Sequence, residues 1–369
     1  TIDYLNIGYP ALYGFHPPEN VKQAFIDALK KDQNYYSATE GIQELRSAIA
    51  KKENSKGFSI GAEDVLVTYG VSEGLDMVMS SIVEEGDEVL LPGPYYPPYA
   101  SYIRLHGGIP IEFSVDLEHS TPDIDDIKSK ITPKTVAICL ISPNNPTGAV
   151  YSKDILLELI ELARRHELIL FTDEIYSKIV YDEAQYIPLA SLADDLFIVS
   201  FNGLSKSYRL AGFRSGWMIL SGNKASAEDY IEGLEILTNM RLCANVPAQF
   251  AVQTALGGYQ SINELILPGG RLKLQRDLTW ELLSQIPGVS CVKPAGAIYM
   301  FPKLDPSVYR IENDVALIMD ILEQEKILLV QGSAFNIQDS QHFRLVFLPR
   351  EDELKQAVLQ IARVLEQYR

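Results

Sequence analysis

Four loops of the sequence hold polar side chains that could do chemistry, and each loop directly follows a run of residues that predicts a β-strand. The loops are residues 70–73, 142–148, 173–176 and 205–214. Ligands of open α/β sheets bind at the carboxyl ends of the strands. We therefore expect the four loops to meet at one edge of a sheet and to form a ligand site there.

The last of these loops contains Ser205, Lys206 and Arg214 between apolar and glycine-rich flanks. An exposed basic loop is the usual setting for a lone lysine or arginine. A lysine in a partly desolvated pocket, by contrast, loses proton affinity and becomes a nucleophile toward carbonyl groups. The flanks favour this second interpretation for Lys206.

Asp173 stands at the end of a predicted buried strand, where a carboxylate needs a partner. A transition metal is not expected, because the five histidines are scattered and no histidine or cysteine cluster accompanies Asp173. The sharper hypothesis is that Asp173 holds a ring nitrogen of a cofactor in its protonated form.

Two further loops present groups at strand ends. In residues 142–148, two prolines and a glycine fix the backbone that carries Asn145. The alternative is a tight turn, but so rigid a loop at this edge favours a function. In residues 70–73, the backbone N–H groups of Val71 and Ser72 open a helix and could seat a phosphate. The alternative is a turn with a capping serine, which this segment taken alone favours.

The elements behind these loops predict the fold class. Short apolar runs at residues 65–68, 88–91, 136–141, 169–172 and 197–201 alternate with helical patterns. Strands that are apolar on both faces and alternate with helices indicate an α/β protein with a largely parallel sheet covered on both sides.

The last third of the chain has a different character. After about residue 225 helical patterns dominate, and they are followed by short predicted strands and a final helix at residues 351–368. This pattern is typical of a smaller α+β lobe. We predict a large domain of residues 19–272 and a small domain made of residues 1–18 and 273–369.

Composition narrows the classes of function. The chain has 369 residues, of which 47% are hydrophobic and 22% charged, so it can bury a large core. No apolar run approaches the ~20 residues that cross a bilayer. The net charge of −17 opposes binding to nucleic acid or anionic lipid. Three widely separated cysteines favour a reduced, cytoplasmic setting, and a chain that begins at Thr1 is expected to lack an N-terminal segment.

The order and spacing of four of these candidate site residues are informative together. Asn145 is followed by Asp173 after 28 residues, by Lys206 after 33 more and by Arg214 after a further 8. The set resembles the class I aminotransferases, which use pyridoxal 5′-phosphate (PLP) on the fold type I scaffold, and the resemblance covers essentially the whole chain. The segments at residues 202–214 and 240–249 look like those of bacterial-type alanine aminotransferases.

The resemblance implies a large domain with a mostly parallel seven-stranded sheet, a smaller α+β domain and a homodimer with shared active sites. It implies that Lys206 binds PLP covalently and later moves the substrate proton. Asp173 would pair with the pyridinium nitrogen, and Tyr176 and Asn145 would hydrogen-bond the ring oxygen O3′. Tyr96 would stack on the ring. The phosphate would be held by Val71, Ser72, Ser205, Arg214 and, from the neighbouring subunit, Tyr36.

Substrate binding would depend on Arg344, which the resemblance places on the α-carboxylate, with Gly8 and Asn145 nearby. One departure is Gly203, where the family often has a serine that contacts phosphate. The implied reaction is L-alanine plus 2-oxoglutarate giving pyruvate plus L-glutamate. The alternatives are an aspartate or aromatic aminotransferase, a C–S lyase on the same scaffold, or a PLP-sensing regulator. The last would need a DNA-binding segment, and the charge of −17 opposes it.

Overall fold

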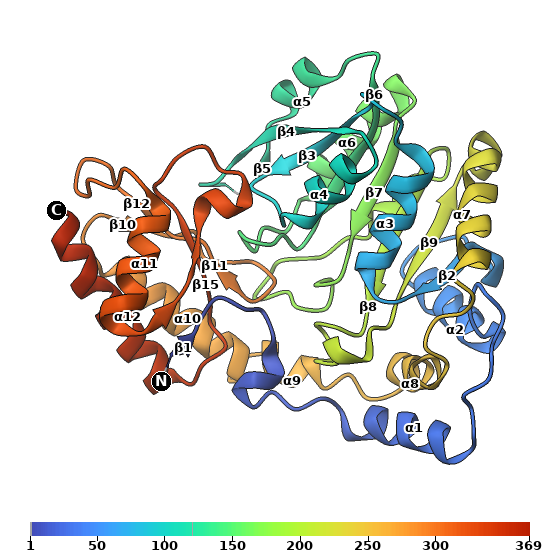
Figure 1. Ribbon diagram of the computed structural model, residues 1–369, viewed down its shortest axis with the longest axis horizontal. Coiled ribbons are helices and arrows are strands. Elements are labelled where there is room, and N and C mark those ends of the chain that lie inside the picture. The colour runs from blue at the N-terminus through green and yellow to red at the C-terminus, as the bar shows by residue number, and fades with distance from the viewer. Residues whose placement is uncertain (1, 120) are drawn as a thin grey trace.

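A central sheet organises the larger of two lobes in this computed structural model, which describes residues 2–119 and 121–369 (Figure 1). Within the described residues its strand order is β2-β9-β8-β7-β6-β3-β4-β5. The strands are β2 (Val65–Thr68), β3 (Glu88–Gly93), β4 (Ile109–Asp116), β5 (Thr121–Pro122), β6 (Thr135–Ile141), β7 (Ile169–Asp173), β8 (Phe197–Gly203) and β9 (Gly216–Gly222).

The prediction of a mostly parallel sheet is confirmed. Strands β4, β3, β6, β7 and β8 run parallel to one another, whereas β9 is antiparallel to both β2 and β8. Seven strands were expected, and the eighth is the two-residue edge strand β5. The predicted strands did not include β4, which is only partly buried, or β9, although the buried residues 217–220 of β9 form a short apolar run.

Helices cover both faces of this sheet, which explains why its strands are apolar on both sides. One core cluster joins the sheet to α2 (Gln43–Asn54), α6 (Lys153–His166) and α8 (Val246–Gly257). The other joins it to α3 (Val71–Ile82), α4 (Pro98–Leu105) and α7 (Glu228–Met240). Strand β2 shows the alternation, since Val65 and Val67 enter the first cluster and Leu66 enters the second. Further helices of this lobe are α1 (Glu19–Lys30) and α5 (Ile124–Lys130).

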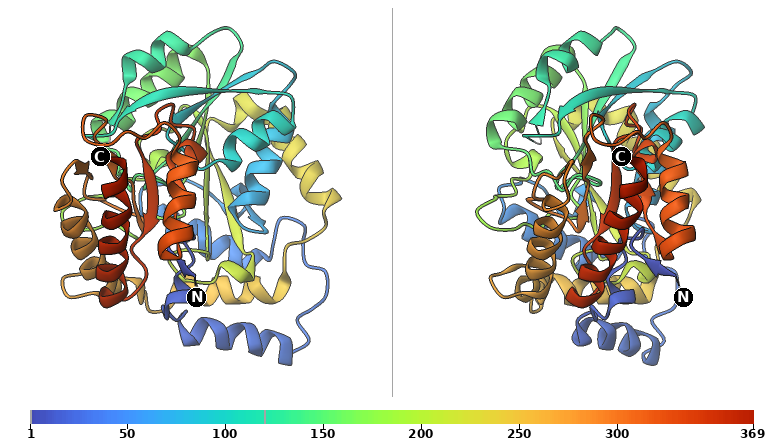
Figure 2. Two further views of the ribbon diagram at one scale, coloured as in Figure 1. Left: turned by 60° about the vertical axis from the view of Figure 1, so that its left-hand side comes forward. Right: turned by 90° about the vertical axis from the view of Figure 1, so that its left-hand side faces the viewer.

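The smaller lobe combines the two ends of the chain (Figures 1 and 2). Strand β1 (Asp3–Tyr4) runs parallel to β13 (Ile327–Leu328), and Leu5 and Phe15 belong to the same core cluster as the C-terminal helices. The remaining elements are α9 (Ile262–Ile266), α10 (Arg271–Ser284), α11 (Asp314–Glu325), α12 (Glu351–Leu365), β10 (Val289–Ser290), β11 (Tyr299–Met300), β12 (Lys303–Leu304), β14 (Val330–Gln331) and β15 (Phe343–Val346). The final helix is shorter than predicted, because a 3-10 turn replaces its last residues.

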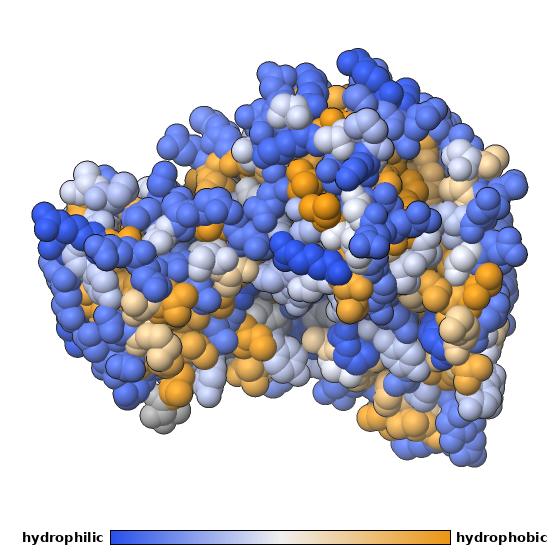
Figure 3. All heavy atoms as spheres, turned by 45° about the horizontal axis from the view of Figure 1, so that its top comes forward, coloured by the Kyte–Doolittle hydropathy of each residue, from blue (hydrophilic) through white to orange (hydrophobic). Residues whose placement is uncertain are grey.

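The predicted domain division stays a prediction, although α10 begins at Arg271, next to the proposed boundary between residues 272 and 273. Among the described residues no helix is both long and apolar enough to cross a membrane. The face in Figure 3 is mostly hydrophilic, with hydrophobic residues in scattered groups.

Candidate active site

A cavity of about 600 Å³ lies at the carboxyl edge of the central sheet, where residues of all four predicted loops line it. The predicted site residues that line it are Gly8, Val71, Ser72, Tyr96, Asn145, Asp173, Tyr176, Ser205, Lys206, Arg214 and Arg344. A larger cavity of about 1050 Å³ lies at the opposite edge, where β6, β7 and β8 begin, and holds none of them. The chemistry therefore points to the smaller cavity.

Lys206 comes from the loop that follows β8 and is half-buried in the wall of the cavity. Its Nζ donates a hydrogen bond to the backbone oxygen of Gly8 (2.8 Å) and lies 5.8 Å from the centre of the Tyr176 ring. The amine thus sits between the N-terminal segment and the end of β7, facing the space that a ligand would fill.

Asp173 is the last residue of β7 and is 7% exposed. Tyr99 Oη donates to its Oδ2 (2.5 Å), and the Ile175 N–H donates to its Oδ1 (3.0 Å). Burial raises the pKa of Asp173, while these two hydrogen bonds and the charge of Lys206 oppose that rise. Tyr99 was missed by sequence reasoning, and only its place in an aromatic segment could have drawn attention to it.

Arg344 lies on β15 and is 7% exposed. Its Nη1 donates to Asn145 Oδ1 (2.9 Å) and its Nη2 to the backbone oxygen of Asn6 (2.5 Å). Among the described residues, Arg344 Nε and Asn6 Oδ1 are buried and have no hydrogen-bond partner. Unpartnered polar atoms of this kind are rare in a core, so two of them beside one cavity indicate a polar ligand.

Asn145 owes its position to the turn around it. The neighbouring Asn144 Oδ1 accepts hydrogen bonds from the Thr147 N–H (3.1 Å) and hydroxyl (2.9 Å), which stabilises the loop. Asn145 is left to face the cavity and to hold Arg344, as the prediction of a functional loop required. Asn144 thus shapes the turn, and Asn145 faces the cavity.

The first turn of α3 forms a seat for an anion. Gly70 precedes this helix with φ 81°, and a Cβ added there would lie 2.4 Å from Arg214 Nη2. Arg214 donates to the backbone oxygens of Ala211 (2.9 Å) and Tyr69 (3.1 Å), which hold it against the helix start. Free N–H groups, the positive end of the helix dipole and a guanidinium all favour an anion.

The alternative interpretation of Ser72 as a capping residue is wrong. The residue before the helix is Gly70, which offers no side chain, and Ser72 occupies the second helical position. The Glu73 carboxylate accepts a hydrogen bond from the N–H of Tyr69, which precedes Gly70 (2.8 Å). Ser72 is therefore free of a capping role and lines the cavity.

Two predicted aromatic residues occupy different settings. Tyr96 lines the cavity, is 42% exposed and packs edge-on against Tyr99, with ring centres 6.4 Å apart. Tyr36 is 78% exposed and does not line the cavity of its own chain. Tyr36 is thus the one predicted residue that the chain by itself does not bring to the site.

The cavity assembles a half-buried amine, a buried carboxylate, a buried guanidinium and an anion seat. Such a set could hold a phosphorylated aromatic cofactor by its phosphate and its ring nitrogen, and a carboxylate substrate by Arg344. It also gathers positive charge in a protein whose net charge is −17. Anionic ligands would therefore be drawn to this place rather than to the surface at large.

Comparison with known proteins agrees with this chemistry. Residues 4–361 match the family model described as "Aminotransferase class I and II". The glutamate-pyruvate aminotransferase AlaA of Escherichia coli strain K12 is 50% identical over 366 residues, covering 99% of this chain and 90% of that protein. An alanine aminotransferase of Mycobacterium tuberculosis is 49% identical over 368 residues, covering 99% and 86%.

Solved structures show the same relationship. A crystal structure of an aminotransferase from Escherichia coli has a TM-score of 0.98 and 50% identity, and the match covers 100% of this chain and 91% of that one. An alanine aminotransferase from Pyrococcus furiosus has a TM-score of 0.95 and 39% identity, covering 100% and 93%. With the geometry of the cavity, these matches show that this chain belongs to the class I and II aminotransferases.

Proposed function

We propose that the protein is an alanine aminotransferase, which moves the amino group of L-alanine to 2-oxoglutarate and yields pyruvate and L-glutamate. The observation that carries the proposal is one cavity that combines Lys206, Asp173 and Arg344. The names of the relatives that are about 50% identical, glutamate-pyruvate and alanine aminotransferases, support this pair of substrates.

The class I and II aminotransferases use PLP, and the residues of the cavity fit it. Asp173 is a buried carboxylate without a contacting cation among the described residues, so a pyridinium N–H would supply the missing partner. Gly70 has no side chain, so Arg214 can lie close beside the start of α3, where the helix N–H groups and the guanidinium together could bind a phosphate. When bound, PLP supplies the electron sink that accepts negative charge from the substrate Cα.

We assign the roles of the cavity residues as follows. Lys206 would attach the cofactor and move the proton at the substrate Cα, because its amine is the one that reaches into the cavity. Asp173 would hold the proton on the ring nitrogen, while Tyr176 and Asn145 would hydrogen-bond O3′ and Tyr96 would cover the ring. The phosphate ligands would be Val71, Ser72, Ser205 and Arg214.

Arg344 would bind the α-carboxylate shared by the amino acid and the oxo acid. Its guanidinium is fixed by Asn145 and Asn6, and its buried Nε has no acceptor among the described residues. A planar fork of donors matches a carboxylate in a way that a lysine cannot. Gly8, whose backbone touches Lys206, would lie beside that carboxylate.

A panel of amino donors tests the choice of substrate. The purified enzyme is supplied with 2-oxoglutarate and alanine, aspartate, phenylalanine or cysteine in turn, and the oxo acid and sulfide released are measured. We expect alanine to have the highest kcat/KM. A higher value for aspartate or phenylalanine would replace alanine by the corresponding donor, and sulfide from cysteine without 2-oxoglutarate would favour the C–S lyase alternative.

We also propose a homodimer in which Tyr36 serves the site of the neighbouring subunit. The support is the exposure of large apolar side chains: Tyr35 is 57%, Tyr36 78% and Met240 75% exposed in the single chain. Large apolar side chains gathered on a surface mark interaction sites. Mixing Tyr36→Phe and Lys206→Ala chains should restore one competent site per hybrid dimer, and inactive hybrids of confirmed composition would exclude shared sites.

The location and the domain boundaries are proposals of the same kind. Cys139, Cys243 and Cys291 are free thiols, which supports a reducing, cytoplasmic setting. The core cluster that joins Leu5 and Phe15 to the C-terminal helices supports a small domain built from both ends of the chain.

A further inference from the structure

Tyr299 lies in the cavity but has no role among the predicted site residues. It belongs to β11, is 2% exposed and faces the cavity beside Arg344. Its hydroxyl is 2.7 Å from the hydroxyl of Tyr176, and either oxygen can be the donor. Buried tyrosine hydroxyls need a partner, and here each hydroxyl is the partner of the other.

The ring of Tyr299 is one of two aromatic rings that lie against the guanidinium of Arg344. The guanidinium carbon of Arg344 lies 4.4 Å from the centre of the Tyr299 ring and 4.7 Å from that of Phe335. Strand β11 pairs with β15, which carries Arg344, so the two side chains come from neighbouring strands. Two aromatic rings packed against a guanidinium fix the orientation of its plane, whereas hydrogen bonds at its Nη atoms alone would leave the plane free to rotate.

The hydroxyl of Tyr299 also leaves no space for a side chain at position 8, which is glycine. A Cβ added at Gly8 would lie 2.1 Å from Tyr299 Oη, so the N-terminal segment passes directly over the phenol. The backbone oxygen of Gly8 accepts the hydrogen bond from Lys206. Tyr299 therefore contacts Arg344, Tyr176 and the backbone at Gly8 together.

We propose that Tyr299 is a positioning residue for this site: its ring sets the plane of Arg344, and its hydroxyl donates to Tyr176 so that Tyr176 donates onward to the cofactor oxygen. The inference rests on the proposed function. It assigns no contact between Tyr299 and the substrate.

The direction of the hydrogen bond follows from the number of protons. Each phenol has one proton to donate. Because Tyr176 would use its proton on the cofactor oxygen O3′, the 2.7 Å contact between the two hydroxyls requires Tyr299 to donate. Burial raises the pKa of Tyr299, but the positive charges of Lys206 and Arg344 outweigh it and leave the pKa below its ordinary value, which agrees with this direction. A donor to Tyr176 strengthens the donation that Tyr176 itself makes.

The test is a pH titration of the PLP-loaded enzyme, followed by the absorbance of PLP on Lys206 without substrate. A hydrogen bond that Tyr176 donates to O3′ stabilises the form of the bound cofactor in which O3′ carries negative charge, and so lowers the pH midpoint of the absorbance change. Tyr299→Phe keeps the ring and removes the hydroxyl, so it should raise the midpoint by roughly 0.5–1 pH unit, the size expected for one neutral hydrogen bond. Tyr181→Phe is the matched control, because Tyr181 is buried nearby and its hydroxyl donates to the Ala297 backbone oxygen instead.

A second variant separates the ring from the hydroxyl. Tyr299→Leu removes the stack on Arg344 and should raise KM for both amino acid and oxo acid about 3–30-fold, whereas Tyr299→Phe should leave KM nearly unchanged. Equal midpoints in Tyr299→Phe, Tyr181→Phe and the unchanged enzyme would overturn the inference while leaving the proposed function intact. A protein without any PLP absorbance would instead overturn the proposed function.

Discussion

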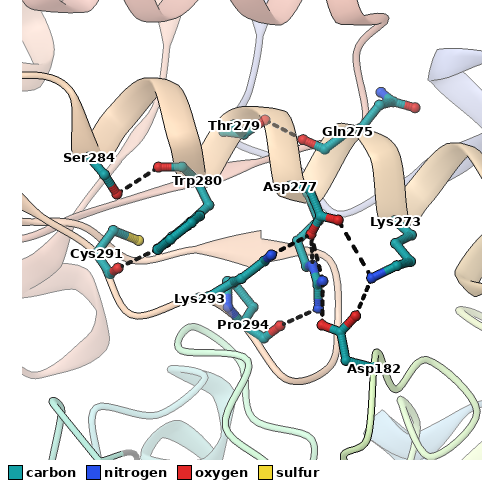
Figure 4. Close-up of polar contacts among 11 residues, drawn as sticks. Asp182, Lys273, Gln275, Asp277, Thr279, Trp280, Ser284, Cys291, Lys293 and Pro294 are labelled. Carbon is teal, nitrogen blue, oxygen red and sulfur yellow. Dashed lines mark hydrogen bonds and ion pairs between the residues drawn. The ribbon is translucent and has the colours of Figure 1, made fainter. Parts of the chain in front are cut away.

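Two groups of charged side chains differ in how completely their charges are paired. The first surrounds Arg276 on α10, which is 1% exposed and donates to Asp182 (2.5 Å), Asp277 (2.6 Å) and the Pro294 backbone oxygen (3.1 Å). Lys273 and Lys293 complete this cluster (Figure 4). The second group lines the cavity, and among the described residues none of its ionised side chains forms an ion pair.

The pairing of charges separates the structural cluster from the functional site. In the cluster around Arg276, every charge already has a partner of opposite sign, so nothing remains to recognise a ligand. In the cavity, Asp173 and Arg344 have only neutral partners and are held apart. A buried charge without a counter-ion is costly, and it persists where a ligand supplies the missing partner.

The largest expected effect is on stability and comes from the paired cluster. Arg276→Met keeps the bulk of the side chain but removes its hydrogen bonds to Asp182, Asp277 and Pro294, so it should lower the free energy of unfolding by about 3 kcal/mol. Urea denaturation at pH 7 measures this. KM for alanine should change little, and a large rise in KM without destabilisation would show that the cluster serves the site.

The same variant has a predicted pH dependence. Burial raises the pKa of Asp182, but hydrogen bonds from Lys273 and Arg276 outweigh it and leave the pKa below its ordinary value. A carboxyl with a lowered pKa stabilises the fold above its unfolded pKa, and that stability is lost as the pH falls through the folded pKa. The stability difference between Arg276→Met and the unchanged protein should therefore be full at pH 7 and shrink below about pH 4.

Asp173→Asn, in contrast to Arg276→Met, should reduce activity without reducing stability. Loss of the carboxylate removes the charge that keeps a ring nitrogen protonated, so kcat should fall roughly 100-fold or more. The cofactor-free variant should be no less stable than the unchanged protein, because burial already disfavours the charge of Asp173. Steady-state kinetics and denaturation of the same preparation measure both, and a near-normal kcat would contradict the assigned role.

Arg344→Lys should produce a smaller, binding-type effect. A charge-assisted bidentate contact contributes about 1.5–3 kcal/mol, which corresponds to roughly 10–100-fold in affinity. KM should rise for both alanine and 2-oxoglutarate, because both carry the α-carboxylate. If neither KM changed when each substrate was varied in turn, the carboxylate site would have to be sought elsewhere.

The smallest effect is expected at the rim of the paired cluster. Lys293 reaches Asp277 (2.9 Å) from a side chain that is 36% exposed, so solvent and salt screen the pair. Lys293→Met should change the free energy of unfolding by less than about 1 kcal/mol. A loss as large as that of Arg276→Met would show that exposure does not rank the members of this cluster.

Most of the fold was predictable from the sequence, because strands that are buried on both faces of the sheet consist of consecutive apolar residues. Strands β2, β3, β6, β7 and β8 were found in this way, each within two residues of its bounds. Strand β4 was not predicted, because it is only partly buried and polar residues interrupt its apolar ones, so it contains no continuous apolar run.

The site was predictable where a residue follows a strand in a loop. Lys206, Asp173 and Asn145 were found by that rule, and the structure brings them to one cavity. Tyr99 and Tyr299 were not found, because a buried tyrosine on a helix or strand looks like a core residue until the partner of its hydroxyl is known. Long-range contacts of this kind leave no local signal in the chain.

We infer that the unpaired charges of the cavity are there to bind PLP that is attached to Lys206. Reduction of the purified protein with borohydride, followed by proteolysis and mass spectrometry, tests this inference. We expect a yellow protein and a single reduced PLP adduct on Lys206, absent in Lys206→Ala. An adduct on any other lysine, or no adduct in protein prepared with PLP, would contradict it.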